Sequence, residues 1–460
     1  MEKRTDANLF KKYHKTLVYD YTEYPTKGNW SEEFGSKDYS NVMSNWLKLN
    51  PKTPILFYVH TPFCEELCYF CLCSKEITRD YEKVKNYLYD YLFKEIDMLK
   101  DLFEKNGISL NVKEIYFGGG SPTYYRNEEF KKLIEKLNGV FDFDKVNDFT
   151  IEVDPRRVDE EKLLFYNSLG VNRLSFGVQD FDIKVQKRIN RIQPAELLHD
   201  LLTERVRSTF KTFNFDLLVG LPGQTVDSLS NTLRKVVELK PPQVQPMMMH
   251  FKPQTRNYMI HMLKDGPLPD FFDRKVLYQT LDDHLTQAGY TDNGFESYAL
   301  PDDELSKAID EKKALYASLG AQKGEATSFV AIGSSGHGCL GDDYYFQNYY
   351  EQDLYKKSLS QNEFPIYRGL KLDQDDKIRR NVIKTLRTYF EYEFSGFNIK
   401  SDETFQNYFE KELVRLTPFI DDSLITINSE AIKITEIGKQ FAPQIVNAFD
   451  RYNPQEIELN

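Results

Sequence analysis

Six short runs of β-forming residues, each followed by a stretch with helical periodicity, constrain the fold of this chain more than any other feature. The predicted strands are ILFYVHT (55–61), KEIYFGG (113–119), DFTIEVD (148–154), NRLSFGV (172–178), NFDLLVG (214–220) and VQPMMMHF (244–251). The predicted helices cover about residues 80–105, 127–138, 158–168, 181–190, 195–209 and 225–238. Repeated βα units build a parallel sheet, so six of them predict an α/β fold with a partial (β/α)6, TIM-like barrel.

Length and local composition predict three parts. A chain of 460 residues is longer than one core usually supports. Residues 1–50 are polar and aromatic, as in KGNWSEEFGSKDYSN, and predict an irregular N-terminal arm with little helix. The barrel and an extension then occupy residues 51–364. From 365 to 460 the alternation stops, and segments such as DDKIRRNVIKTLRTYFEYEF predict a small, mainly helical C-terminal domain with a short hairpin.

Overall charge and hydropathy exclude several classes of protein. The net charge of −11 and the pI of about 5.4 argue against nucleic acid as a partner, because phosphate binding depends on clustered Lys and Arg. No stretch of about 18 apolar residues predicts a membrane span, and the start MEKRTDANLFKKYHK lacks the apolar core of a secretory signal. We therefore expect a cytoplasmic protein. We also expect a monomer.

The strongest chemical signal is the segment YVHTPFCEELCYFCLC, directly after the first predicted strand. It contains four of the five cysteines within ten residues, which indicates metal ligation in a reducing compartment rather than a disulfide framework. Cys64, Cys68 and Cys71 predict three thiolate ligands of a [4Fe–4S] cluster. The fourth iron then stays open and can bind the amino and carboxylate groups of S-adenosylmethionine.

Two points about the cysteines stay open. A zinc site is the alternative, but zinc modules usually pair two CxxC-like halves, and only Cys339 remains elsewhere in the chain. Cys73 is a candidate catalytic residue near the substrate, a fourth ligand, or a small buried thiol.

Candidate cofactor residues follow the later predicted strands, whose carboxyl ends converge at one rim of a barrel. The turn GGGSPT (118–123) lets the backbone approach a ligand closely and offers N–H groups to it, although such turns are often only turns. Glu152 ends the third strand and suits a ribose or an ammonium group; otherwise it is a solvated cap. Gln179, Arg191 and Asp216 follow along the chain and are expected at the same rim.

The CxxxCxxC pattern resembles the radical S-adenosylmethionine (SAM) superfamily, and the longer segment resembles its oxygen-independent coproporphyrinogen III dehydrogenases. The likeness extends through LGDDYYFQN (340–348), YRGLKL (367–372) and DDKIRRNVIKTL (375–386). It implies a barrel of the radical SAM type and one or two SAM molecules. Tyr58, Gly119 and Glu152 would contact the first molecule. The implied contacts of a second molecule are Phe70, Gly120, Ser121, Gln179, Arg191 and Asp216.

The resemblance also implies a reaction, oxidative decarboxylation of coproporphyrinogen III to protoporphyrinogen IX without oxygen. An electron donor such as a flavodoxin or ferredoxin would reduce the cluster. Relatives with the same three ligands methylate substrates, degrade heme or carry heme. Cys73 argues against a heme chaperone, since chaperones have an aromatic residue there, whereas methyl transfer or opening of a tetrapyrrole stays an alternative.

Two segments depart from the resembled pattern and concern the substrate rather than the cofactor. LYASLGAQKGEATS (315–328) lacks an expected Gln-Gly-Tyr segment, and GSSGHGCLGD (333–342) places His337 where an aliphatic residue is expected. Imidazole titrates near neutrality, so His337 is a candidate catalytic proton donor or acceptor. The alternative is a loop histidine without a role. His250 follows three methionines that we interpret as core filler.

Overall fold

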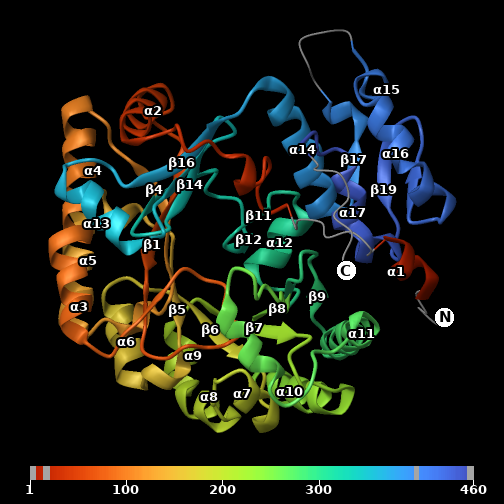
Figure 1. Ribbon diagram of the computed structural model, residues 1–460, viewed down its shortest axis with the longest axis horizontal. Helices are drawn as coiled ribbons and strands as arrows, with labels where there is room; N and C mark the ends of the chain where they lie inside the picture. The colour runs from red at the N-terminus through yellow and green to blue at the C-terminus, as the bar shows by residue number, and fades with distance from the viewer. Residues whose placement is uncertain (1–6, 14–20, 398–402, 453–460) are drawn as a thin grey trace.

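The computed structural model describes residues 7–13, 21–397 and 403–452, and in these residues one twelve-stranded sheet curves round as an open barrel (Figure 1). The six predicted strands are present as β1 (Pro54–Thr61), β4 (Asn111–Gly119), β5 (Asp148–Val153), β6 (Arg173–Gln179), β7 (Thr212–Val219) and β8 (Gln243–Met248). They are parallel and adjacent in chain order. The predicted partial α/β barrel is therefore confirmed.

The connecting helices lie on the outer side of the sheet (Figure 1). They are α3 (Tyr81–Asn86), α4 (Phe93–Asn106), α5 (Asn127–Asn138), α6 (Glu160–Ser168), α7 (Ile183–Arg188), α8 (Ala195–Leu201), α9 (Glu204–Thr209) and α10 (Val226–Leu239), followed by α11 (Phe271–Gln287) and α12 (Glu304–Asp310). Two predicted helices are interrupted. A π-helical turn, Tyr87–Leu92, separates α3 from α4, and α9 starts anew because the Thr203 side chain caps it at the Val206 N–H.

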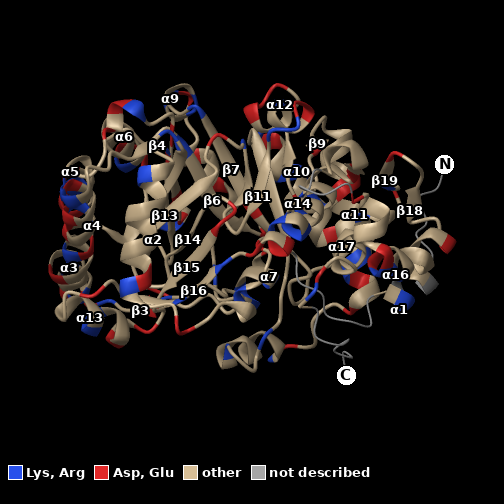
Figure 2. Ribbon diagram, turned by 90° about the horizontal axis from the view of Figure 1, so that it is seen from above, with Lys and Arg blue, Asp and Glu red and all other residues tan. Residues whose placement is uncertain are grey.

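Successive side chains of each parallel strand point to opposite faces of the sheet. In β5, Phe149, Ile151 and Val153 belong to the apolar core under the helices, whereas Thr150 and Glu152 line the barrel interior. Figure 2 accordingly shows the charged residues mostly on the surrounding helices and loops, with largely uncharged strands. No helix in the part of the chain that the structure describes combines the length and apolarity needed to cross a bilayer.

The sheet extends beyond the six predicted strands at both edges. β13 (Ser328–Ile332) lies parallel to β1, and the antiparallel strands β14 (His337–Leu340), β15 (Tyr344–Asn348) and β16 (Ile366–Lys371) follow it. At the other edge β10 (Tyr298–Ala299) and β9 (Thr291–Asp292) pair antiparallel with β8 and with each other. Helix α13 (Gln352–Ser360) connects β15 to β16. The large sheet therefore continues to Lys371, past the predicted boundary at 364.

The prediction of little helix in residues 1–50 is wrong. Helix α2 (Ser36–Leu49) has fourteen residues, and α1 (Ala7–Tyr13) precedes it. Tyr39, Met43 and Leu47 recur every four residues on one face of α2 and are buried in the barrel core. The Gly, Ser and Asn residues around α2 hide this spacing in the sequence.

The C-terminal residues form a mainly helical unit with its own core, as predicted. It contains α14 (Gln374–Tyr389), α15 (Phe405–Tyr408), α16 (Glu410–Asp421) and α17 (Ala442–Asn447). The predicted hairpin is β18 (Ile425–Ile427) and β19 (Ala431–Ile434), which β17 (Glu391–Glu393) extends to three strands. Tyr21 and Tyr24, from the N-terminal segment, are buried in this C-terminal core.

Candidate active site

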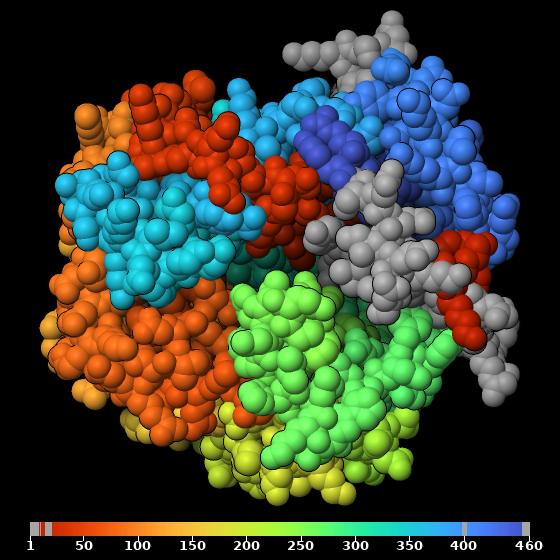
Figure 3. Space-filling view, viewed as in Figure 1, coloured from red at the N-terminus to blue at the C-terminus, as the bar shows by residue number. Residues whose placement is uncertain are grey.

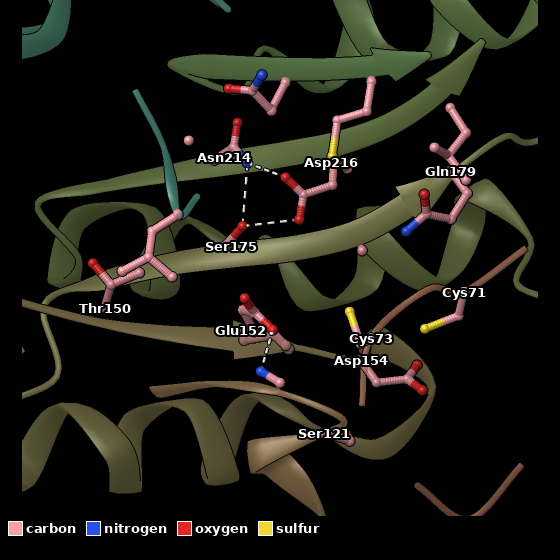
Figure 4. A pocket seen from close by; sticks show the side chains of 18 of the residues that line it. Cys71, Cys73, Ser121, Thr150, Glu152, Asp154, Ser175, Gln179, Asn214 and Asp216 are labelled. Carbon is pink, nitrogen blue, oxygen red and sulfur yellow. Dashed lines mark hydrogen bonds between the residues drawn. The ribbon is translucent and has the colours of Figure 1, made fainter. Parts of the chain in front are cut away.

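A cavity of about 550 Å³ lies inside the barrel, and its size is within the usual range of small-molecule sites. All the predicted site residues line it except Tyr58 and His337. These lining residues are Cys64, Cys68, Phe70, Cys71, Cys73, Gly119, Gly120, Ser121, Glu152, Gln179, Arg191 and Asp216. Figure 4 shows several of them projecting from neighbouring strands toward the same space. The structure thus brings the cysteine loop and the expected cofactor residues together.

The cysteine loop is enclosed by two short parallel strands, β2 (Phe63–Cys64) and β3 (Glu76–Ile77). Side chains donate to its carbonyls from within the loop and from distant segments. Lys75 Nζ, in the loop, and Tyr258 Oη donate to the Cys71 carbonyl, and Asn190 Nδ2 donates to the Leu67 carbonyl at 2.8 Å. Arg191 Nη1 lies 3.7 Å from Cys68 Sγ. The loop is therefore held in shape with its thiols at the cavity.

The four thiols of the loop are free and differ in exposure. Burial raises the pKa of Cys64 to about 12, so this thiol needs a bound cation to ionise. A hydrogen bond from Cys73 lowers the pKa of Cys71, and the same contact raises the pKa of Cys73. Cys73 is exposed while Cys68 is buried. Cys71 is thus the thiolate of the pair, and Cys73 keeps its proton.

Within the described residues, no three His, Cys, Asp or Glu side chains are grouped as ligands of one metal ion. A [4Fe–4S] cubane binds each thiolate through a different iron, so its ligands do not converge on one point. The residues present fit a cluster with SAM in two respects. Three thiols share one cavity wall, and the buried Oε1 of Gln179 has no hydrogen-bond partner although Gln179 lines the same cavity.

Two half-buried carboxyl groups, on β5 and β7, also line the cavity. Glu152 accepts hydrogen bonds from the Gly119 N–H at 3.1 Å and from Tyr116 Oη at 3.2 Å. Burial, and then the nearby Asp216, raise the pKa of Glu152 to about 8. Asp216 accepts from Ser175 Oγ at 3.0 Å and Asn214 Nδ2 at 2.6 Å (Figure 4), and burial raises its pKa to about 6. A cationic ligand between these groups would be stabilised, because their charges are otherwise desolvated.

Arg191 connects the cysteine loop to the strands of the barrel. Its guanidinium donates to the Gly177 carbonyl at 2.7 Å and lies 3.4 Å from Asp154 Oδ1. Arg156 also pairs with Asp154, at 2.7 Å. Although burial opposes the shift, these two cations hold the pKa of Asp154 well below its usual range. Asp154 is therefore ionised and fixes both guanidinium groups.

The glycine turn after β4 needs its glycines. Gly119 has a φ of +110°, which disfavours other residues. A Cβ at Gly120 would lie 2.7 Å from the Phe63 carbonyl oxygen and 2.9 Å from that of Thr61. Glycine has no Cβ and can lie this close, so that the Gly120 N–H donates a hydrogen bond to the Thr61 carbonyl at 2.6 Å. The turn thus packs directly on the strand pair that leads into the cysteine loop.

Tyr58 and His337 lie behind the cavity wall rather than in it. Tyr58 is buried and its hydroxyl is 2.9 Å from His60 Nδ1. His337 begins strand β14, so it is not in a loop, and its Nε2 contacts the Ser318 hydroxyl, Lys27 Nζ at 3.2 Å and Glu23 at 3.4 Å. Burial, followed by the charge of Lys27, lowers the pKa of His337.

The Ser318 contact joins the two segments that depart from the resembled pattern. Ser318 lies between β11 (Leu315–Ala317) and β12 (Gly320–Gln322), a hairpin whose residues line the cavity. On its other side, the ring of Tyr316 stacks on Phe295 with centroids 3.2 Å apart. The Arg387 guanidinium of α14 lies 3.9 Å from the Phe295 ring centroid. The hairpin is therefore a cavity wall supported by both β14 and the C-terminal unit.

The sequence prediction missed several polar residues of the site. Asp154, Tyr116, Ser175 and Asn214 line the cavity and contact predicted residues. Two of them could have been found from the sequence. Ser175 in β6 and Asn214 in β7 are polar residues between apolar neighbours, and this alternation predicts that they face the barrel interior. His250 also lines the cavity. The sequence alone did not show whether this residue faces the barrel interior.

Comparison with known proteins agrees with this geometry. The sequence model of the radical SAM superfamily matches residues 58–236. The oxygen-independent coproporphyrinogen III oxidase of Escherichia coli (strain K12) is 34% identical over 454 residues, which are 99% of this chain and 97% of that protein. The enzyme of the same name from Helicobacter pylori (strain 26695) is 32% identical over 448 residues, 97% and 96% of the two chains. The solved structure of the E. coli coproporphyrinogen III oxidase, described as a radical SAM enzyme, aligns with a TM-score of 0.88 over 97% of this chain and 99% of that one.

Proposed function

The chain belongs to the oxygen-independent coproporphyrinogen III oxidases of the radical SAM superfamily, and from this we propose that it converts propionate side chains of coproporphyrinogen III into vinyl groups. Each conversion removes a hydrogen atom and one further electron from the propionate and releases its carboxylate as carbon dioxide. An electron acceptor takes up the second electron, and conversion of two propionates yields protoporphyrinogen IX. The observation that carries the proposal is the likeness over nearly the whole length of both chains. The enzyme is thus an oxidoreductase of porphyrin biosynthesis.

A [4Fe–4S] cluster and SAM supply, when bound, the radical that abstracts hydrogen. We propose that Cys64, Cys68 and Cys71 hold the cluster. Arg191 stabilises thiolate charge at Cys68, since its guanidinium already contacts that sulfur. Phe70, between two of the cysteines, supplies an apolar contact surface for the cofactor.

The proposed SAM contacts come from two groups of cavity residues. We propose that Gly119 and Glu152 bind one SAM molecule, with Tyr58 supporting that wall from behind through His60. Gly120, Ser121, Gln179, Arg191 and Asp216 are the proposed contacts of a second molecule. An equilibrium binding stoichiometry of two SAM molecules per chain supports this assignment, and a stoichiometry of one contradicts it.

Two further roles concern the substrate. We propose that Cys73, which is exposed at the cavity and keeps its proton, faces the substrate as a catalytic residue rather than binding iron. His337 is proposed to act as a positioning residue through Ser318, because it contacts the cavity hairpin and does not line the cavity.

We further propose a cytoplasmic monomer that takes electrons from a small carrier protein. Free thiols suit a reducing compartment.

Anaerobic incubation of the reconstituted protein with coproporphyrinogen III, SAM and dithionite tests the function. Vinyl products formed together with carbon dioxide are expected. Methylated or linearised tetrapyrrole, or tight heme binding without turnover, would contradict the proposal.

A further inference from the structure

Three segments around the cysteine loop contain Lys and Arg but neither Asp nor Glu: 67–75, 183–192 and 250–264. Their cations are Lys75, Lys184, Lys187, Arg188, Arg191, Lys252, Arg256 and Lys264. The whole chain has a net charge of −11, whereas the only charged residues in these three segments are basic. We call the outer side of these three segments the basic face.

The three segments form one structural unit. The backbone N–H of Tyr69 donates to the Ile189 carbonyl at 3.0 Å, and Arg256 Nη2 donates to the Leu72 carbonyl at 3.2 Å. Arg188 Nη2 joins α7 to the 3-10 helix Asn257–Leu263 through the Met262 carbonyl at 3.1 Å. A small apolar core lies beneath, in which residues of the cysteine loop pack against α7 and this 3-10 helix. Figure 3 shows the segment around residue 260 beside the orange N-terminal part of the barrel on the viewed face.

The basic face is exposed and its outermost charges are available. Lys184, Lys187, Lys252 and Lys264 are exposed. Among the residues that the structure describes, no carboxylate lies within ion-pair distance of these four ammonium groups. Apolar side chains stand among them, including Ile183 (48% exposed) and Ile260 (56% exposed). Exposed apolar residues among cations are typical of a protein interaction surface rather than of a solvated face.

The position of the basic face points to electron transfer. Arg256 and Asn190 hydrogen-bond to loop carbonyls on either side of Cys68 and Cys71, so a protein seated there lies one layer of side chains from the cluster ligands. The same thiols line the cavity proposed for cofactor and substrate.

We infer that the basic face docks a small acidic one-electron carrier protein; this rests on the proposed function, which needs an electron for each SAM cleaved. The carrier loses one electron and the cluster gains it, and no bond forms or breaks between the two proteins. Negative charge on the carrier complements the free lysines and speeds encounter. Weak electron-transfer complexes need only a small interface, and the three segments supply exposed residues that are neighbours in space.

Charge reversal tests the docking surface. The variants are K184E/K187E and K252E/K264E, and the matched control is K37E/K357E, which reverses two exposed lysines on α2 and α13. Bleaching of the cluster absorbance by a reduced, negatively charged flavodoxin gives the second-order rate constant. Titration with the oxidised flavodoxin gives a dissociation constant that does not depend on turnover. Dithionite, which needs no docking surface, is the reference reductant.

Each basic-face variant is expected to slow reduction by flavodoxin about 10-fold at low ionic strength and to weaken flavodoxin binding, whereas the control variant and dithionite rates stay at the wild-type level. The difference is expected to shrink at high ionic strength. Unchanged flavodoxin rates in both variants would overturn the inference. If dithionite-reduced wild-type protein cleaves no SAM, the proposed function fails instead, so the two failures are distinguishable.

Discussion

At the scale of single residues, position along a strand determines chemical role. Glu152 stands between Ile151 and Val153 in β5, and its neighbours face the helices while its carboxyl group faces the cavity. Asp216 repeats this arrangement in β7, between Phe215 and Leu217. Two carboxyl groups thus enter an interior where burial raises both pKa values. A cationic ligand between them would provide the charge that ionises them.

Substitution of Cys68 and of Cys73 is expected to have different effects, the first on cluster content and the second on decarboxylation. Cys68→Ala removes a buried thiol that contacts Arg191, so we expect loss of most iron and sulfide from anaerobically reconstituted protein. Cys73→Ala is the matched variant, and it should keep the wild-type iron and sulfide content while slowing decarboxylation at least 10-fold. Equal metal loss in both variants would contradict the proposed role of Cys73.

His337 is expected to affect substrate binding more than cofactor cleavage. His337→Leu removes the contact with Ser318 that supports the cavity hairpin, so KM for coproporphyrinogen III should rise about 10-fold. His337→Gln retains a polar group that can reach Ser318, and it should recover much of the loss. SAM cleavage without substrate should be unchanged in both variants. A bell-shaped wild-type pH profile that loses the same limb in both H337L and H337Q would instead indicate proton transfer by His337.

At the scale of elements, the glycine turn after β4 connects the cofactor site to the cysteine loop. Gly120→Ala is expected to force this turn away from β1 and β2, because the new Cβ meets backbone oxygens that cannot rotate away. We expect a loss of about 1–3 kcal/mol in stability and weaker SAM binding. Gly396→Ala is the control, since no heavy atom of the residues that the structure describes lies within 4 Å of that Cβ. Urea unfolding and SAM titration measure the two effects, and wild-type values for G120A would refute the expected strain.

The sequence predicted the six βα units because each strand is short, apolar and followed by a helical period. It did not predict β13 to β16. The residues of β13 and β14 lie among the glycines and serines of SFVAIGSSGHGCL, where turn signals outweigh strand signals. It also missed the β11–β12 hairpin. Short strands that depend on partners distant in sequence leave little local pattern, so these tertiary contacts could not be predicted from one chain.

The candidate site was predictable to the extent that motifs follow strands. The cysteines and the residues after β4 to β7 lie in one cavity as expected. The location of His337 was not predictable, because the contacts with Glu23 and Lys27 join segments at opposite ends of the sequence.

At the scale of the whole molecule, buried carboxyl groups make stability depend on pH. Burial, with the nearby Asp148 adding to it, raises the pKa of Glu114 from 4.5 to about 7. The folded state therefore holds this proton more tightly than the unfolded state, and the resulting stability is complete below pH 4.5 and lost as pH rises to about 7. The Gln side chain in Glu114→Gln binds no proton, so the variant does not lose stability in this way. Between pH 4.5 and about 7, its free energy of unfolding should therefore rise relative to that of the wild type by up to about 1.4 kcal/mol per pH unit. Urea midpoints at several pH values measure the difference, and parallel pH curves for the two proteins would disprove the assignment.

The placement of β13 beside β1 has a consequence for biosynthesis. The strand that leads into the cysteine loop acquires its second neighbour only after residue 332 has left the ribosome. Until then one edge of β1 lacks its native pairing partner, and such edges attract other chains. Iron–sulfur assembly on the nascent polypeptide would therefore meet an incomplete pocket, so cluster delivery is best timed after translation has passed the last parallel strand.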